Sequence, residues 1–261
     1  MTENSKSSDV VTAGLVIIGN EILSGRTKDA NLQFLGDKLI KLGMRMAEAR
    51  VGSDIPASIV EAVNTLRARY DYVFTTGGIG PTHDDITSEC IAQAFGLEFG
   101  PNPEAVAILE DHYAEGELTA ARLRMANTPK DAVLIENPVS KAPGFQVENV
   151  FVLPGVPRIM QAMFGGMRHR LTGGTPMVSR SITSNVPEGK AGGPLTDLQA
   201  NHPETEIGSY PFFKLGGFGV NLVVRGVDQA RVDAACDDLI KMLKSLGGTA
   251  IDGETKGEAL T

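Results

Sequence analysis

The stretch Thr75-Thr76-Gly77-Gly78-Ile79-Gly80-Pro81-Thr82-His83-Asp84-Asp85-Ile86-Thr87 places three glycines between two segments of different periodicity. The residues just before the glycines include Tyr72-Val73-Phe74, an apolar run typical of a short buried strand. After the glycines, Ile86, Cys90 and Ala94 recur at helical spacing. The sequence therefore predicts a strand, a glycine turn and a helix in succession.

The glycine turn is a candidate phosphate site. Glycine permits positive φ and a close approach of a ligand to the main chain, and the free N–H groups that open a helix attract an anion. Asp84 and Asp85 follow at once, and carboxylates beside a phosphate are suited to hold a divalent cation such as Mg²⁺, Mn²⁺ or Co²⁺. The candidate phosphate ligands are Thr76, Gly77, Gly78, Gly80 and Thr82.

Each part of this stretch also has a purely structural interpretation. The glycines alone fit a tight turn, Thr82 fits a helix N-cap, and the two acids fit residues that complement the helix dipole. The stretch matches neither the Walker pattern, because no Gly-Lys-Ser/Thr follows, nor the dinucleotide-binding fingerprint. The combination of strand, glycine turn, cap and two acids favours a phosphate site.

Strands and amphipathic helices alternate along the first half of the chain. The segments 13–18, 45–51 and 72–74 indicate strands, and the segments between them carry apolar stripes at helical spacing. This order predicts an α/β fold with a mostly parallel sheet, in which ligands bind at the carboxyl ends of the strands. Glu21 and Asp54 each follow a strand, so we expect them to share a crevice with the glycine turn. A loop acid and a helix N-cap, respectively, are equally open interpretations of these two residues.

The segment 171–176 separates two patterns of strands and helices and predicts a domain boundary. We expect a disordered tail at 1–10, an α/β domain at 11–171, a smaller α+β domain at 177–251 and a second tail at 252–261. The smaller domain shows no catalytic constellation, so its expected role is structural.

Composition narrows the function further. A formal net charge of −8 over 261 residues argues against a nucleic-acid partner or an anionic membrane, and it is compatible with a small phosphorylated ligand held by backbone amides. Cys90 and Cys236 lie far apart in helical patterns, which indicates buried free thiols in a reducing compartment. The first residues lack an apolar leader and no run is long enough to span a bilayer, so we expect a soluble cytoplasmic protein with no membrane partner.

Five motifs follow one another along roughly the first two thirds of the chain: Gly19-Asn20-Glu21-Ile22-Leu23-Ser24-Gly25, Asp29-Ala30-Asn31, the glycine stretch 76–87, Ala142-Pro143-Gly144-Phe145 and Leu153-Pro154-Gly155-Val156-Pro157. Together they resemble the amino-terminal region of the competence and damage-inducible protein A (CinA) family. The resemblance implies the molybdopterin-binding fold of molybdenum-cofactor biosynthesis proteins (MoaB/Mog-like), a three-layer α/β fold. The later run Gly208-Ser209-Tyr210-Pro211 is similar to the smaller domain that follows in this family and in eukaryotic FAD synthases.

The resemblance implies two activities for the glycine turn. Molybdenum-cofactor proteins bind a pterin phosphate there, and some adenylylate it with magnesium. The competence-protein branch, which this chain resembles more, is associated with metal-dependent pyrophosphatase action on ADP-ribose or related dinucleotides. We therefore expect a divalent-metal-dependent pyrophosphatase that assembles as a homo-oligomer. A carrier of molybdopterin or of a nucleotide, an adenylyltransferase-like protein and a non-catalytic interaction protein stay open as alternatives.

For a pyrophosphatase, we expect Asp85, Asp84 and Asp54 to position the metal and the attacking water. The family's carboxy-terminal amidase domain has no room in this sequence, so we expect a stand-alone form without deamidase activity on nicotinamide mononucleotide. The further candidates for contacts with the phosphate or the nucleotide are Glu21, Thr27, Asn31, Lys141, Gly144, Pro154, Gly155 and Arg158.

Structural interpretations stay open for part of this set. Lys141 also fits a solvated lysine, and Arg158 fits an arginine at the start of a helix. Pro154 and Gly155 fit a loop-shaping role. The sequence departs from the family's pattern at His83, where glutamate is common, and at Lys141, which brings a cation to the Ala-Pro-Gly motif.

Overall fold

The chain folds into two compact units, each with its own core. Unit 1 ends at Gly174 and unit 2 begins at Thr175. The computed structural model describes residues 10–214, 217–254 and 258–259. The tail expected at 1–10 lies outside these residues except for Val10. Within the described part of the chain, no helix combines the length and the apolar character needed to span a lipid bilayer.

Unit 1 is built on a six-stranded sheet with the order β2-β1-β3-β8-β7-β6. Strands β2, β1, β3 and β8 run parallel, and β7 runs antiparallel to both of its neighbours. This α/β architecture confirms the predicted fold class. The elements of unit 1 in chain order are β1 (Val11–Ile18), α1 (Asn20–Leu23), α2 (Asn31–Ile40), β2 (Met44–Gly52), α3 (Pro56–Arg69), β3 (Tyr72–Thr76), α4 (Thr87–Phe95), β4 (Phe99–Pro101), α5 (Pro103–His112), α6 (Ala120–Leu123), η1 (Arg124–Ala126), β5 (Asn127–Pro129), β6 (Val133–Ile135), β7 (Gly144–Val147), β8 (Val150–Leu153), α7 (Pro157–Met167) and η2 (Arg168–Arg170).

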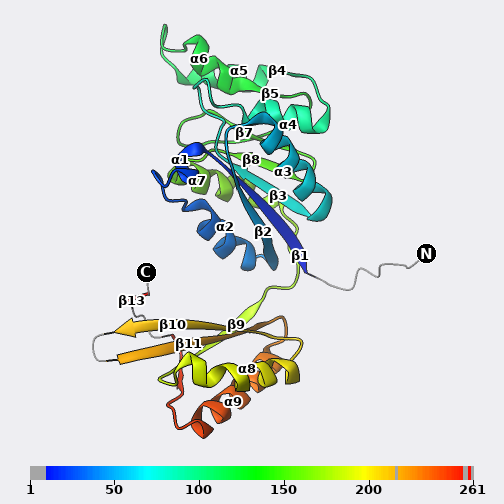
Figure 1. Cartoon of the computed structure of the whole chain (residues 1–261). Coiled ribbons are helices and arrows are strands. Elements are labelled where there is room, and N and C mark those ends of the chain that lie inside the picture. Colours follow the sequence, from blue (N-terminus) through cyan, green and yellow to red (C-terminus); the bar gives the residue numbers. More distant parts are fainter. Residues whose placement is uncertain (1–9, 215–216, 255–257, 260–261) are drawn as a thin grey trace, which may run out of the picture. The chain divides into compact units, whose positions relative to one another are not determined.

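Helices cover both faces of this sheet and bury its central strands (Figure 1). Side chains alternate across a strand, so Leu15 and Ile17 of β1 pack with α2 and α7, whereas Val16 and Ile18 pack with α3 and α4. Because both faces are covered, β1 must be apolar at every one of these positions. The result is the three-layer arrangement that the resemblance implied.

Two local features of unit 1 depart from a simple pattern. The segment 137–145 is rich in turn-forming residues but is not a loop throughout, because Gly144 begins β7, which pairs with β6 and β8. The segment 103–125 forms two short helices, α5 and α6, instead of one long helix. Gly116 lies between them with a φ of 82°, in the left-handed region where a right-handed helix cannot continue.

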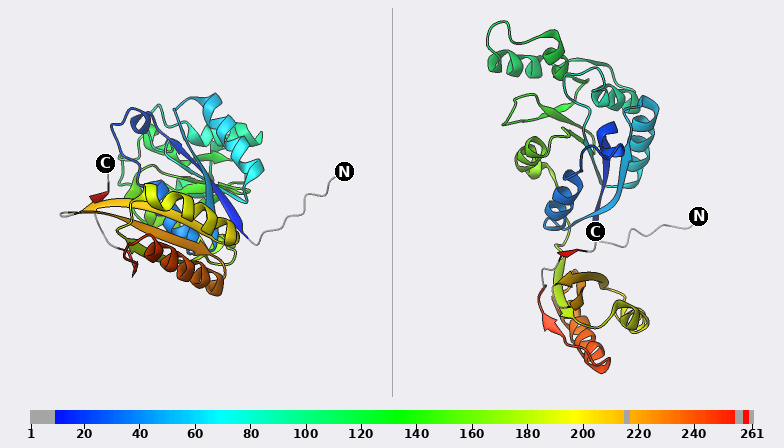
Figure 2. Two further views of the ribbon diagram at one scale, coloured as in Figure 1. Left: turned by 60° about the horizontal axis from the view of Figure 1, so that its bottom comes forward. Right: turned by 60° about the vertical axis from the view of Figure 1, so that its left-hand side comes forward.

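Unit 2 has an antiparallel sheet with the order β12-β9-β11-β10-β13. Both of its helices lie on the same side of this sheet (Figure 2), where Ile182, Leu222 and Leu239 join one apolar cluster. This architecture matches the predicted smaller α+β domain. The elements of unit 2 are β9 (Val178–Ser184), α8 (Glu188–Asn201), β10 (Glu206–Lys214), β11 (Gly217–Gly226), α9 (Gln229–Ser245), β12 (Ile251–Asp252) and β13 (Glu258–Ala259).

The segment 252–261 is not simply a tail. Asp252 belongs to β12, where Arg180 of β9 donates a hydrogen bond of 2.7 Å from Nη2 to its Oδ2 atom. The strand Glu258–Ala259 pairs with β10. The rest of that expected tail, at 255–257 and 260–261, lies outside the described residues.

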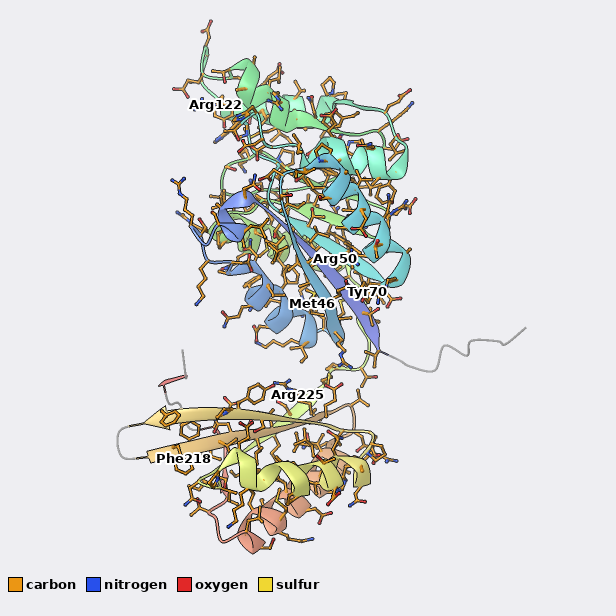
Figure 3. All side chains as sticks on the ribbon, in the orientation of Figure 1. Met46, Arg50, Tyr70, Arg122, Phe218 and Arg225 are labelled. Carbon is orange, nitrogen blue, oxygen red and sulfur yellow. The ribbon has the colours of Figure 1, made fainter. Side chains whose placement is uncertain are left out.

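The β2 edge of the main sheet is tied to α3 by charged side chains. Glu48 of β2 accepts hydrogen bonds from Tyr70 Oη at 2.7 Å, from Arg50 Nε at 2.8 Å and from Arg69 Nη1 at 2.9 Å. Figure 3 labels Arg50 of β2 and Tyr70, which directly follows the end of α3. The hydrogen bonds from Tyr70 and Arg50 lower the pKa of Glu48 below 4.5.

Candidate functional site

The carboxyl ends of four parallel strands meet at one edge of the main sheet. In register, Ile18 of β1 lies beside Gly52 of β2, and Thr76 of β3 lies between Ile17 of β1 and Leu153 of β8. The turns that follow these strands therefore adjoin one another, as the sequence predicted from topology.

The turn after β3 requires glycine at its first two positions. Gly77 and Gly78 have φ values of 106° and 67°, which side chains rarely adopt. A Cβ atom on Gly77 would collide with the carbonyl oxygen of Ile18, and one on Gly78 would collide with Thr87 Oγ1. A Cβ on Gly80 would lie only 2.7 Å from Asp85 Oδ2. The glycines thus allow the turn to pack against β1 and α4.

The turn presents three consecutive backbone N–H groups, at Gly78, Ile79 and Gly80, that donate no hydrogen bond to any described residue. Successive free amides of this kind form an anion-binding concavity. The expectation for Gly77 needs correction, because its N–H donates to the Leu153 carbonyl at 3.1 Å and is not available to a phosphate. Ile79, which sequence reasoning missed, supplies the third free amide of the turn.

The loop between the glycines and α4 is longer than expected. Helix α4 begins at Thr87 with Ile86 at its N-cap, so Thr82 is not the cap that one interpretation proposed. The amides of the turn consequently belong to a loop and not to the first turn of the helix. Thr87 N–H donates to the Gly78 carbonyl at 2.9 Å and thereby fixes the loop to the helix.

Thr82 organises the two acids of this loop. Its N–H donates to Asp85 Oδ2 at 2.8 Å, and its hydroxyl lies 2.6 Å from Asp84 Oδ1 and also within hydrogen-bond distance of Asp85 Oδ2. A hydroxyl has one proton, so it donates to one carboxylate at a time. The hydrogen bond from Thr82 lowers the pKa of Asp84 below 3.8 and keeps this exposed acid charged.

One oxygen of each acid, Asp84 Oδ2 and Asp85 Oδ1, accepts no hydrogen bond from the described residues. No group of three or more His, Cys, Asp or Glu side chains suited to a metal occurs in the part of the chain that the structure describes. Mg²⁺ in proteins usually binds one or two carboxylates and completes its coordination with water and substrate phosphates. Two carboxylates therefore suit a Mg²⁺ ion that binds together with a phosphate substrate better than one held by protein ligands alone.

Asp54 does not cap α3, whose N-cap is Ile55. Instead, its Oδ2 atom accepts a hydrogen bond of 2.9 Å from the Asn20 N–H at the start of α1. This bond joins the turn after β2 to the turn after β1. Asp54 therefore stands at the same sheet edge as the glycine turn, with a structural role that the sequence did not indicate.

A small cavity of about 40 Å³ gathers five of the predicted contact residues. Two of them, Asn31 and Thr76, are buried, with 2% and 1% of their surface exposed. Asn31 Nδ2 donates to the Gly155 carbonyl at 2.8 Å, but Asn31 Oδ1 and Thr76 Oγ1 have no hydrogen-bond partner among the described residues. The predicted residues that line this cavity are Glu21, Thr27, Asn31, Thr76 and Gly155, together with Asp29, which was not predicted as a contact.

Other predicted contacts lie elsewhere. Lys141 has a φ of 62° and lines a separate cavity of about 620 Å³ beside α5 and the end of α7. Gly144 is buried, and a Cβ there would collide with the Val152 carbonyl oxygen, which explains this glycine by packing alone. Arg158 is exposed in the first turn of α7, and Pro154 is half-buried in the preceding loop.

Comparisons with known proteins match both units. A family described as "probable molybdopterin binding domain" matches residues 14–173, and the middle domain of FAD synthase matches residues 176–247. A protein of Pyrobaculum calidifontis is 34% identical over 90% of this chain and 96% of its own length. Protein TV0584 of Thermoplasma volcanium is 38% identical over 61% of this chain and 64% of its own length. The crystal structure of "the protein CinA with unknown function from Thermoplasma acidophilum" is 36% identical, with a TM-score of 0.59 over 62% of this chain and 99% of that one.

Proposed function

The chain is a CinA-like member of the molybdopterin-binding domain family, and we propose that it is a divalent-metal-dependent pyrophosphatase that cleaves ADP-ribose or a similar dinucleotide diphosphate. The observation that carries the proposal is the free amide run of Gly78, Ile79 and Gly80 directly followed by the two acids Asp84 and Asp85. Amides supply donors for phosphate oxygens, and acids supply ligands for a cation that neutralises the diphosphate.

Different residues of the site have different roles in the cleavage. The three amides hold oxygens of the diphosphate, where negative charge develops during the reaction. The free oxygens of Asp84 and Asp85 would hold a divalent cation, which would supply an activated water molecule and offset the charge of the phosphates. Water oxygen bonds to one phosphorus, the bridging P–O bond breaks, and ADP-ribose yields AMP and ribose 5-phosphate. Asp54 holds the turn after β1 in place through Asn20.

Release of AMP from ADP-ribose by the full chain tests the proposal, with FAD and NADH as further substrates and Mg²⁺, Mn²⁺ or Co²⁺ as the cation. Asp85→Asn retains an oxygen that accepts from Thr82 but removes the charge, so we expect it to fold and to lose at least about 100-fold in turnover. Asp37→Asn is the matched control, because Asp37 is an exposed acid of α2 paired with Lys41. Equal turnover by wild type and Asp85→Asn would refute the role of Asp85.

A second candidate is a carrier of molybdopterin or of a nucleotide, which the family description favours. This function needs the same amides but no cleavage. Absence of turnover with every diphosphate and cation, combined with tight pterin binding, would support the carrier and exclude the pyrophosphatase.

We further propose a homo-oligomer in a reducing, cytoplasmic compartment, without nucleic acid as a partner. The compartment is supported by Cys90 and Cys236, which are both buried free thiols. The net charge of −8 argues against nucleic acid. Light scattering of the purified chain measures the mass of the assembly, and a mass near 27.6 kDa would contradict an oligomer.

A further inference from the structure

Unit 1 contains a second cavity, whose lining includes no residue of the glycine turn. Its volume of about 620 Å³ is in the range of sites that enclose a small organic molecule. It is bordered by α5, by β6 and the loop that follows β6, and by the end of α7 with η2. Lys141 is the one residue of the predicted site that lines it. The phosphate site therefore does not explain this cavity.

The loop after β6 holds Lys141 in a strained conformation. Its φ of 62° lies in the left-handed region, which residues with a side chain rarely adopt. The buried side chain of Asn137 fixes this loop, since its Oδ1 atom accepts from the Val139 and Ser140 N–H groups and its Nδ2 atom donates to the Ala142 carbonyl at 2.8 Å. The Lys141 N–H also donates to the Asn137 carbonyl at 3.2 Å. Strain that the surrounding structure holds in this way is typical of ligand-binding positions.

Two cationic side chains line the cavity, and neither pairs with an acid of the described residues. Lys141 forms no side-chain hydrogen bond or ion pair with any residue in the described part of the chain. Arg170 donates from Nη2 to the Leu134 carbonyl at 2.7 Å and from Nη1 to Gln146 Oε1 at 3.5 Å, and both acceptors are neutral. Both cations are half-buried. Because charges withdrawn from water are normally paired, these two favour an anionic occupant.

Three acids border the same cavity, and their exposure separates them from the cations. Glu104 and Asp111 lie two turns apart on α5, and Glu136 follows β6. All three are exposed, whereas Lys141 and Arg170 are half-buried. Water screens the charge of exposed acids more effectively than that of half-buried groups. An anion inside the cavity is therefore attracted by the cations more strongly than it is repelled by the acids.

Apolar side chains complete the lining, among them Met167, which is buried, and Ile108 and Leu134, which are half-buried. We propose that this cavity binds a small organic anion, with a carboxylate or phosphate group on Lys141 and Arg170 and an apolar body against Ile108, Leu134 and Met167. The guanidinium of Arg170 retains N–H donors for such a group beyond those that bond to Leu134 and Gln146. This inference is independent of the proposed pyrophosphatase, which uses the glycine turn and its two acids.

Calorimetric titration of the full chain with phenyl phosphate, with benzoate and with inorganic phosphate tests the cavity. The first two probes share a ring and differ in the anionic group, and the third lacks the apolar body. Lys141→Gly removes one cation and also suits the left-handed backbone, so it should melt at or above the wild-type temperature. Arg170→Gln removes the other cation and retains a donor for the Leu134 carbonyl. Lys130→Gln is the matched control, because Lys130 is an exposed lysine of the same unit that pairs with Glu98 and does not line this cavity.

We expect Lys141→Gly and Arg170→Gln each to weaken the binding of the tighter aromatic probe about tenfold, and Lys130→Gln to leave it unchanged. Inorganic phosphate should bind more weakly than phenyl phosphate. A preference for phenyl phosphate would identify a phosphate ligand, and a preference for benzoate a carboxylate ligand. Lys141→Gly alone decides the outcome if Arg170→Gln fails to fold. Equal affinities of wild type and Lys141→Gly, or no binding of either aromatic probe by wild type, would overturn the site and leave the pyrophosphatase proposal untouched.

Discussion

Gly78→Ala tests whether the glycine turn is held by packing against α4. The new Cβ would stand at a φ of 67°, which costs about 1–2 kcal/mol for a residue with a side chain. It would also collide with Thr87 Oγ1, and overpacking of this kind costs about 1–3 kcal/mol. We therefore expect unit 1 to lose about 2–5 kcal/mol of unfolding free energy.

Thr87→Ala separates these two contributions. It removes the colliding hydroxyl, which has no hydrogen-bond partner among the described residues, and leaves Thr87 Cβ as the nearest atom at 3.2 Å. In the Thr87→Ala background, Gly78→Ala should cost only the backbone part, about 1–2 kcal/mol. The double-mutant cycle should thus show a coupling of about 1–3 kcal/mol.

Thiol labelling measures each unit by itself, because Cys90 lies in α4 of unit 1 and Cys236 in α9 of unit 2. Burial raises the pKa of each thiol to about 11, so neither reacts appreciably near pH 8 until its unit opens. A loss of 2 kcal/mol should speed the labelling of Cys90 by about 30-fold and leave Cys236 unchanged. An equal cost of Gly78→Ala in both backgrounds would refute the collision.

Three further changes test other parts of the molecule. Glu48→Gln removes a carboxyl whose pKa is lowered below 4.5 in the folded protein. The stability that this carboxylate contributes is therefore fully present above pH 4.5 and is lost as the pH falls through its folded-state pKa. The urea midpoints of wild type and Glu48→Gln should accordingly approach each other in acid, and a difference that stays constant with pH would contradict this. Lys141 has a positive φ that glycine adopts more easily, so we expect Lys141→Gly to raise the unfolding free energy of unit 1 by up to about 1 kcal/mol. The turnover of ADP-ribose should not change. A large loss of turnover would instead indicate that Lys141 contacts the phosphates. Phe151→Ala removes a fully buried ring that is tilted against the ring of Phe74, with the two centroids 5.4 Å apart. It should lower the unfolding free energy by about 3–5 kcal/mol and accelerate the labelling of Cys90, and a loss below about 1 kcal/mol would contradict the described core.

Periodicity predicted the fold because the central strands are buried on both faces. A strand such as β1 has no exposed side to interrupt its apolar run, and its helices carry clear apolar stripes. Strand β7 escaped this reasoning because it begins at Gly144, behind a run of turn-forming residues. The short strands at 251–252 and 258–259 depend on pairing with distant β9 and β10, which no local pattern encodes.

The site was predictable where it depends on strand ends and not where it depends on individual hydrogen bonds. The parallel order places Glu21, Asp54 and the glycine turn at one edge. The hydrogen bond from the Gly77 N–H to the Leu153 carbonyl could not be predicted from the sequence, because it depends on the register in which β8 pairs with β3. The unpartnered oxygens of Asn31 and Thr76 likewise appear only once burial is known.

The most direct test of the central claim is ³¹P NMR of ADP-ribose incubated with the full chain and Mg²⁺. The account predicts that the two diphosphate resonances give way to those of AMP and ribose 5-phosphate with wild type and with Asp37→Asn, but not with Asp85→Asn. Diphosphate resonances that persist unchanged with wild type, in the presence of Mg²⁺, Mn²⁺ or Co²⁺ and with ADP-ribose, FAD or NADH as substrate, would contradict it.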